Sequence, residues 1–296
     1  MAGTSSQGHY GVRSQLTGWL FLLPGFGIIC LCVLLPAALA LGLSFTNCSR
    51  FLTVQWAGLD NYRRILTDPV ALKAVGNTLY YLALFVPTNL ALALGIALLL
   101  NRRFPGIKFI RSVYFVPVAV SGIVAVSIFR FLFNYDNGPI NAVISTMGFE
   151  PVPWLASEGW AMIAIVMITL WKSTAFFSII FLAALQDVPQ ELYEAASVDG
   201  AGRWAKFFHV TAPSLLPVIM IVFTLSAIGA FRIFEPMFVL TRGGPADSTV
   251  TVSLLAYSAA FGSGELGYAN AISFVLLAVI LAVTLVLNRI SRKLEA

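Results

Sequence analysis

Charged residues are scarce in this chain of 296 residues. Asp, Glu, Lys and Arg make up 10% of it and 59% is hydrophobic, whereas soluble domains have roughly 25% charged and about 45–50% apolar residues. The mean hydropathy is +0.88. This composition excludes an ordinary soluble domain and indicates an integral membrane protein. The net charge of +5 comes without a block of basic residues, so we attribute it to cytoplasmic loops and expect no nucleic-acid partner.

Residue types that build metal and redox sites are also few. The chain has only two histidines, His9 and His209, and its three cysteines form no CxxC pair. Cys30 and Cys32 lie within an apolar run, which favours a packing role. We therefore expect neither a metal site nor a disulfide framework.

The chain also lacks the loop that cradles nucleotide phosphates. No GxxxxGK[ST] motif occurs: "GAGRWAK" has no glycine before its lysine, and "GGPADST" has no lysine. Without that loop the chain cannot hold ATP in this way. We expect that it is not an enzyme and binds no cofactor of its own.

Six apolar stretches can each cross a bilayer, which takes about 20 residues in a helix. They cover residues 19–45, 75–100, 113–133, 161–185, 213–239 and 268–287. All six carry glycine or proline, which lipid tolerates when neighbouring helices satisfy the freed backbone groups. The pattern predicts an all-α integral membrane protein with six transmembrane helices bundled over residues 19–288. The first apolar run is too long for a cleavable signal peptide.

The distribution of Lys and Arg favours both termini in the cytoplasm. With this orientation, "NRRFPGIKFIR" and the C-terminal "NRISRKLEA" lie inside the cell. Residues 1–18 and 289–296 then form cytoplasmic tails. The outer segment 134–160 contains "NGPINAVISTMG", which predicts a short amphipathic helix.

Four carboxylates cluster on the cytoplasmic side, in "QDVPQELYEAASVDGAGRWAKFFHVTAPSLLP". Asp187 is a suitable N-cap for a first short helix over residues 191–196. Gly200 and Gly202 can end that helix in a sharp turn, and a second helix follows over residues 203–210. Small residues at the centre would let another backbone approach closely. We therefore predict a docking surface on the loop formed by residues 187–212.

This loop resembles the "EAA" loop of ATP-binding-cassette (ABC) importer permeases. Glu194-Ala195-Ala196 is followed after three residues by Gly200, and then by a proline at the start of a helix. In that family the loop inserts as a coupling helix into the ATPase subunit. The Ile-x-Leu-Pro ending of the family pattern reads Val-Thr-Ala-Pro here, with alanine in place of leucine. The resemblance implies that these residues couple to the ATPase: Glu191, Tyr193, Glu194, Ala195, Ala196, Asp199 and Gly200.

Other stretches are similar to the carbohydrate-uptake branch of these permeases, which includes maltose-type and glycerol-phosphate-type systems. They are "AGLDNYRRIL", "YFVPVAVSGIVAV", "WKSTAF", "FRIFEPMFVLTRGGPADST" and "GYANAISFVL". The resemblance implies the type I importer permease fold in a bacterial or archaeal cell (inner) membrane. Its implied solute is a sugar or related compound, with glycerol-3-phosphate or a glycerophosphodiester as the alternative.

The resemblance also implies partners. These are a second homologous permease, two ATPase subunits that bind ATP and Mg, and an extracellular or periplasmic solute-binding protein, all in contact with membrane lipid. The solute-binding protein would deliver the solute, and the ATPases would drive its passage through alternating access.

Polar residues within membrane spans are candidates for a substrate pathway. At 1.5 Å per residue, Lys172 lies about 16 Å into the fourth span, close to mid-bilayer. It could pack beside carbonyls or line the pathway. Arg232 and Glu235 are three residues apart and could pair on one helical face, as a structural pair, a gate or a contact to the solute-binding protein. Asn89 and Asn270 are further candidates of this kind.

Two other classes of membrane protein fit the sequence less well. An ion-coupled secondary transporter would show carboxylates or paired polar breaks near mid-membrane, and the only acidic residue in a predicted span is Glu235. An intramembrane protease would need a nucleophile with a base, or a metal site. His209 lies in the predicted cytoplasmic loop and not in a span, so it does not supply such a base within the membrane. An importer permease is therefore the best interpretation.

Overall fold

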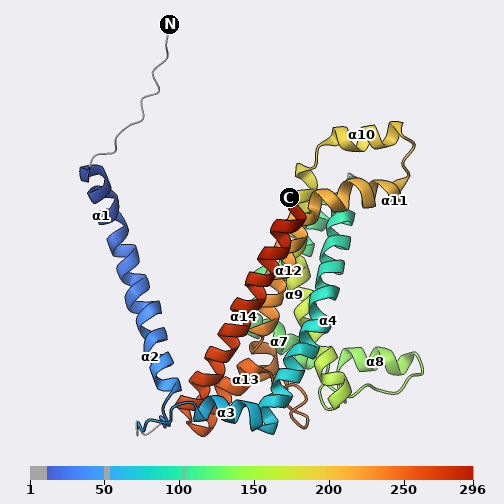
Figure 1. Ribbon diagram of the computed structural model, residues 1–296. Helices are drawn as coiled ribbons and strands as arrows, with labels where there is room; N and C mark the ends of the chain where they lie inside the picture. The colour runs from blue at the N-terminus through green and yellow to red at the C-terminus, as the bar shows by residue number, and fades with distance from the viewer. Residues whose placement is uncertain (1–11, 50–53, 103, 296) are drawn as a thin grey trace.

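The computed structural model, which describes residues 12–49, 54–102 and 104–295, is a bundle of long helices joined by short helices and loops (Figure 1). Within this part, five helices are long and apolar enough to cross a membrane, and a bent pair can form a sixth span. The predicted all-α membrane fold is therefore confirmed. Residues 1–11 of the predicted N-terminal tail and the last residue of the chain lie outside the described residues.

The helices have the following bounds in chain order: α1 (Val12–Ile29), α2 (Leu35–Ser44), α3 (Asp60–Thr67), α4 (Pro69–Leu100), α5 (Ile107–Tyr114), α6 (Val116–Ala119), α7 (Gly122–Leu132), α8 (Pro139–Thr146), α9 (Glu158–Asp187), α10 (Gln190–Val198), α11 (Arg203–Lys206), α12 (Ala212–Phe231), α13 (Val252–Tyr257) and α14 (Leu266–Glu295). A π-helical turn, Cys30–Leu34, joins α1 to α2. Several helices extend past the predicted apolar limits, because polar residues beside an apolar run can continue the helix. α4, for example, begins after Asp68, whose carboxylate accepts hydrogen bonds from the backbone N–H groups of Val70 and Ala71.

The third predicted span, 113–133, is not one helix. A bend of 99° separates α5 and α6 from α7. Val120 and Ser121 are extended at the bend, with ψ of 131° and 140°. The prediction of a continuous helix was wrong because hydropathy does not register a two-residue break between apolar segments.

The fifth predicted span also ends earlier than expected. α12 stops at Phe231, not at residue 239. The chain then turns through Pro236 into a π-helical turn, Met237–Thr241. Residues 232–234 are not helical and helical geometry resumes at Glu235 and Pro236, so the apolar residues that follow belong to another element.

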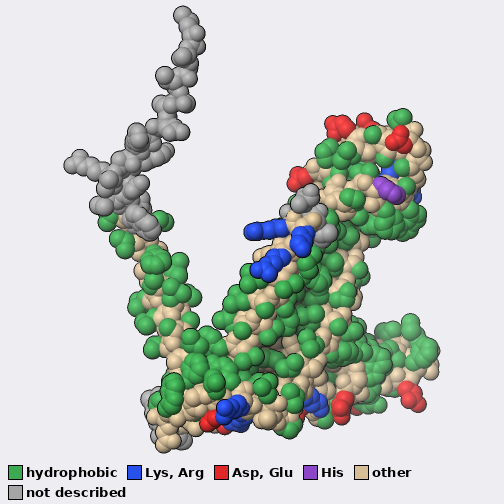
Figure 2. Space-filling view, in the orientation of Figure 1, with side chains coloured by type: hydrophobic (Ala, Val, Ile, Leu, Met, Phe, Trp, Pro, Cys, Tyr) green, Lys and Arg blue, Asp and Glu red, His purple; other side chains and the backbone are tan. Residues whose placement is uncertain are grey.

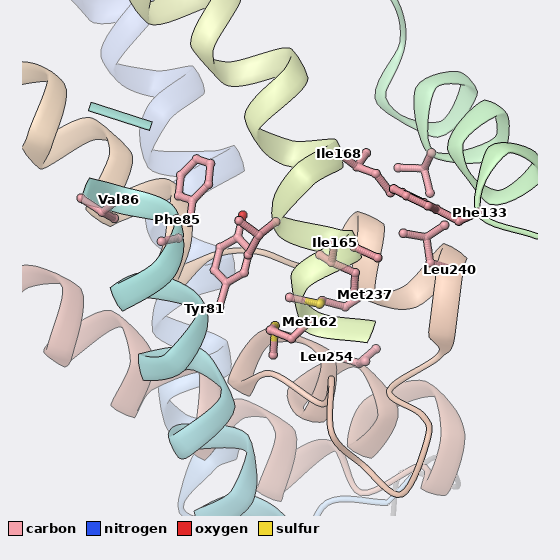
Figure 3. Packing of buried hydrophobic residues seen from close by; sticks show 14 of the residues in the cluster. Tyr81, Phe85, Val86, Phe133, Met162, Ile165, Ile168, Met237, Leu240 and Leu254 are labelled. Atoms are coloured by element: carbon pink, nitrogen blue, oxygen red, sulfur yellow. The ribbon is translucent and has the colours of Figure 1, made fainter. Parts of the chain in front are cut away.

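The largest core cluster lies between α4, α9 and the Met237–Thr241 turn (Figure 3). The rings of Tyr81 and Phe85 stack with their centroids 5.3 Å apart, and Met162, Ile165 and Met237 fill the space beside them. α4 and α9 pack along much of their length, where small residues allow close approach of the two backbones. Six alanines are fully buried on these two helices: Ala74, Ala93, Ala97, Ala161, Ala164 and Ala175.

The first span stands apart from the bundle. α1 leans away from α14, and α2 approaches the bundle only near the end that carries α3 (Figure 1). None of the apolar window within Leu20–Ser44 is buried. Its apolar side chains are therefore available to lipid or to another chain.

We call the two ends of the bundle the α3 end and the α10 end. A polar network ties three elements together at the α3 end. Arg64 of α3 donates to both carboxylate oxygens of Glu265, over 2.7 and 3.1 Å. Its guanidinium lies 4.1 Å from the ring centroid of Tyr268, in a cation–π contact. The Tyr268 hydroxyl donates to Asp68 over 2.8 Å, which joins α14 to the cap of α4.

Both carboxylates of this network have shifted pKa values. The Arg64 hydrogen bond holds the pKa of Glu265 below its ordinary value of 4.5, although partial burial acts in the opposite direction. For Asp68, burial raises the pKa, but hydrogen bonds from Tyr268 and from backbone N–H groups lower it by more. A lowered pKa contributes stability that is present above the ordinary pKa and lost as pH falls through the lowered one.

We predict that Glu265→Gln lowers thermal stability at neutral pH but not in acid. Arg64 and Glu265 are 47% and 42% exposed, so solvent screening limits the loss to about 0.5–1 kcal/mol. The difference between the variant and the unchanged chain should shrink as pH falls below 4.5, because Glu265 becomes protonated. Thermal melts of the purified protein at a series of pH values measure this.

Asp60→Asn is the matched control, since Asp60 pairs with Arg63 at 3.8 Å and both are more than 70% exposed. It should change stability little at any pH. A loss for Glu265→Gln that persists unchanged in acid would contradict the ion-pair explanation.

Candidate functional site

α10 and α11 protrude from one end of the bundle as a helix–turn–helix (Figure 1). The predicted N-cap role of Asp187 is wrong, because α9 continues through this residue. Val188 and Pro189 are extended and separate α9 from α10, which begins at Gln190 without a side-chain cap. Pro189 explains the position of the break, since it disfavours helical geometry at Val188.

The turn after α10 is a Schellman motif. Gly200 has φ of +78°, its N–H donates to the carbonyl of Ser197, and the N–H of Ala201 donates to that of Ala196. These two bonds satisfy carbonyls at the end of the helix. No atom outside the local chain lies within 4 Å of a Cβ added at Gly200. Glycine is therefore required here for its backbone conformation and not for space.

Side-chain hydrogen bonds hold the two arms of the loop together. The hydroxyls of Tyr193 and Thr211 lie 3.0 Å apart. The Lys206 amine donates to the Ser197 hydroxyl over 2.6 Å, and that hydroxyl donates to the Tyr193 carbonyl over 2.7 Å. Tyr193 is half-buried and thus stabilises the loop from within.

Three acidic residues of the loop face solvent. Glu191, Glu194 and Asp199 are exposed, and none of them forms an ion pair with another described residue. Acidic side chains gather at this tip of the molecule (Figure 2). Ala195 is exposed and Ala196 half-buried beside them, so the surface is both acidic and open to close approach.

The same loop exposes large apolar side chains that the sequence analysis did not select. Val198 is 89% exposed and Trp204 is 77% exposed. Trp204 stacks on Phe208 with ring centroids 6.3 Å apart. The pairing of Trp204 with Phe208 could have been predicted from the sequence, because residues four apart on a helix share a face. The apolar group consists of Leu192, Val198, Trp204 and Phe208.

Two of the five predicted pathway residues meet at the bend between α6 and α7. The Lys172 amine donates to the carbonyl of Val120 over 2.9 Å. On the other side of the bend, the Glu235 carboxylate lies against Gly122, where an added Cβ would come within 2.5 Å of Oε2. Lys172 and Glu235 are both half-buried. The structure thus brings opposite charges to the two sides of one break.

The other three pathway candidates are separate from this bend. Asn89 is fully buried; its amide donates to Ser226 over 3.0 Å and accepts from Ser173 over 3.1 Å. This links α4, α9 and α12. Asn270 is half-buried in α14.

Arg232 is exposed directly after α12. The predicted helical pair of Arg232 with Glu235 is not formed, because the helix ends before both residues.

No group of three His, Cys, Asp or Glu side chains that could hold a metal ion occurs among the residues that the structure describes.

Comparison with known proteins identifies the family. Residues 90–296 match the family described as binding-protein-dependent transport system inner membrane component. The trehalose/maltose transport system permease protein MalF of Thermococcus litoralis is 33% identical over 281 residues, which is 95% of each chain. The sulfoquinovosyl glycerol transport system permease protein SmoG of Agrobacterium fabrum is 34% identical over 280 residues, covering 94% of this chain and 91% of its own.

The fold is also similar to that of a solved bacterial ABC transporter involved in the import of the acidic polysaccharide alginate. The TM-score is 0.84 at 22% identity, covering 95% of this chain and 97% of that one. On these grounds, the chain belongs to the family of binding-protein-dependent transport system inner membrane components, as a multi-pass permease of the carbohydrate-uptake ABC importer type.

Proposed function

We propose that this permease moves a sugar or glycoside delivered by an external binding protein, and that its α10–α11 loop, residues 187–212, docks on a separate ATPase. The observation that carries this proposal is the loop itself, which combines a fixed turn, unpaired carboxylates and exposed apolar side chains. The names of the relatives, which mention trehalose, maltose and sulfoquinovosyl glycerol, favour glycosides over glycerol-3-phosphate or a glycerophosphodiester.

The proposed assembly has a second homologous permease, two ATPase subunits and the solute-binding protein. ATP and Mg would be bound by the ATPases, because this chain has no phosphate loop. The exposed apolar surface of α1 supports a further chain or lipid beside it. Both termini would be cytoplasmic, since the C-terminus and the start of α1 lie toward the α10 end (Figure 1), where the ATPase would dock.

The loop is well placed to transmit movement because only short connections join it to two spans. α9 runs to Asp187 and α10 begins three residues later. On the other arm, α11 continues through a π-helical turn, Phe207–Thr211, into α12, so that Arg203–Phe231 is one helical rod. Displacement of the loop by closing ATPases would therefore move α9 and α12. The hydrogen bonds of Asn89 would carry this movement to α4.

We predict that Gly200→Val uncouples ATP hydrolysis from uptake. A β-branched residue in the left-handed region costs about 1–2 kcal/mol, which lowers the population of the docking turn about tenfold. Solute uptake into proteoliposomes should fall accordingly while the complex still assembles. Glu194→Lys should have the same effect by reversing a charge at the docking surface.

Gly202→Val is the matched control. Gly202 has φ of −73° and ψ of 177°, and no atom outside the local chain lies within 4 Å of an added Cβ. Valine adopts this conformation readily, so uptake should be retained. Equal uptake by the Gly200 and Gly202 variants would exclude the coupling role of the turn.

We also propose that the bend between α6 and α7 borders the solute pathway, with Lys172 and Glu235 holding it from either side. Polar breaks in spans occur where backbone lines a cavity or a protein interface. Ser121 at this bend is exposed, and the Lys172 amine partners the carbonyl that the break frees. The bend is thus the feature near mid-membrane that could change conformation during transport.

We predict that Lys172→Met lowers uptake at least about fivefold, because an unpaired interior carbonyl costs about 1–3 kcal/mol. Assembly and basal ATPase activity should be retained, and Lys172→Arg should restore part of the uptake by supplying a donor. Gly122→Ala should reduce uptake independently, since its Cβ would displace the Glu235 carboxylate.

Gly229→Ala is the control for the alanine substitution, because nothing lies within 4 Å of a Cβ there. The pathway assignment fails if Lys172→Met transports normally. If that variant does not assemble, Lys172 is structural.

A further inference from the structure

A cavity opens at the α10 end of the bundle. It is separate from both the loop 187–212 and the bend between α6 and α7. Its volume is about 460 Å³, and it lies between the end of α4, the start of α5 and the last turn of α9. Three basic side chains line it, Arg102, Lys108 and Arg111, together with the amides of Asn101 and Gln186. No carboxylate contributes to this lining among the described residues.

The three cations differ in how they are held. Arg111 donates through Nε and Nη2 to the carbonyl of Leu100, over 3.1 and 2.6 Å. This bond ends α4 and fixes the guanidinium, leaving Nη1 without a bonded partner in the described part of the chain. Arg102 and Lys108 are exposed and form no ion pair with any described residue. Like charges gathered around one cavity repel each other and attract an anion.

Apolar side chains also lie in the lining of this cavity and next to it. Phe104 and Ile107 contribute to its lining, and Phe104 is 43% exposed. Leu99 on α4 is 57% exposed as well. A soluble anion would leave this apolar surface uncovered, whereas an amphiphile would cover it while its charged group filled the cavity.

The position matches the boundary of the membrane. Leu100 and Gln186 stand at the ends of two spans, Pro69–Leu100 and Glu158–Asp187. Basic pockets between transmembrane helices at this level bind anionic lipid headgroups. We propose that the cavity binds the phosphate group of an anionic phospholipid and that the acyl chains lie against the start of α5 and the end of α4.

The test uses the assembled transporter and native mass spectrometry with added phosphatidylglycerol or phosphatidylcholine. The double variant Arg102→Gln and Lys108→Gln removes two cations from the cavity. Each removed cation should weaken phosphatidylglycerol binding about fivefold, whereas phosphatidylcholine binding should not change. The matched control, Arg292→Gln with Lys293→Gln, removes two exposed cations from α14 and should retain phosphatidylglycerol binding.

Three results would overturn the proposal. Equal loss in the cavity and α14 variants would show a general effect of surface charge. Loss of ATPase subunits from the double variant with lipid binding retained would make the cavity a protein contact. Displacement of phosphatidylglycerol by an equal concentration of inorganic phosphate would make it a site for a soluble anion. If the double variant does not assemble, Lys108→Gln alone gives the same test, because the Lys108 side chain bonds to no described residue.

Discussion

Backbone N–H and C=O groups cannot remain unpaired in a hydrocarbon environment, and this requirement governs where the helices of this permease break. Several helix ends and breaks have a specific side-chain partner for the groups that they free. Asp68 caps the start of α4, and Arg111 takes the carbonyl at its end. Lys172 takes the carbonyl of Val120 at the bend. The charged residues of this apolar chain are therefore concentrated at helix ends and breaks.

The breaks also determine which parts of the molecule can move relative to one another. Long spans packed through fully buried alanines and aromatic rings behave as rigid rods. The chain changes direction at the breaks between them. The loop at 187–212 joins two such rods, and the bend beside Lys172 divides a third. Force applied to the loop would therefore reach the bend through α9, which carries both the start of the loop and Lys172.

The sequence predicted the elements that depend on composition and local pattern. The six apolar segments, the short helix α8 and the turn at Gly200 all follow from hydropathy or from glycine. The break at Val120 was not predicted, although Pro117 and Gly122 flank it, because every span carries glycine or proline and the side chain that stabilises this break lies 52 residues away. The contact between Glu235 and Gly122 was missed for the same reason.

Local rules also failed where two of them competed. Asp187 satisfies the residue preference for an N-cap, but α9 continues through it and Pro189 sets the break instead. For other residues the sequence did not show the environment. Asn89 is recognised from the sequence as a polar residue in a span, but only the structure shows that it bonds to Ser173 and Ser226 in the core. The apolar residues of the loop, such as Trp204, were hidden by an overall apolar composition. Exposure, which tertiary structure decides, separates them from the core.

Photo-crosslinking at Val198 tests the central claim most directly, because this side chain is 89% exposed at the tip of the loop. A photoreactive amino acid at position 198 in the assembled transporter should crosslink to the ATPase subunit. The same amino acid at Phe149, which is 70% exposed near α8 at the opposite end, should not. Absence of the crosslink at 198, or equal crosslinking from both positions, would contradict the account.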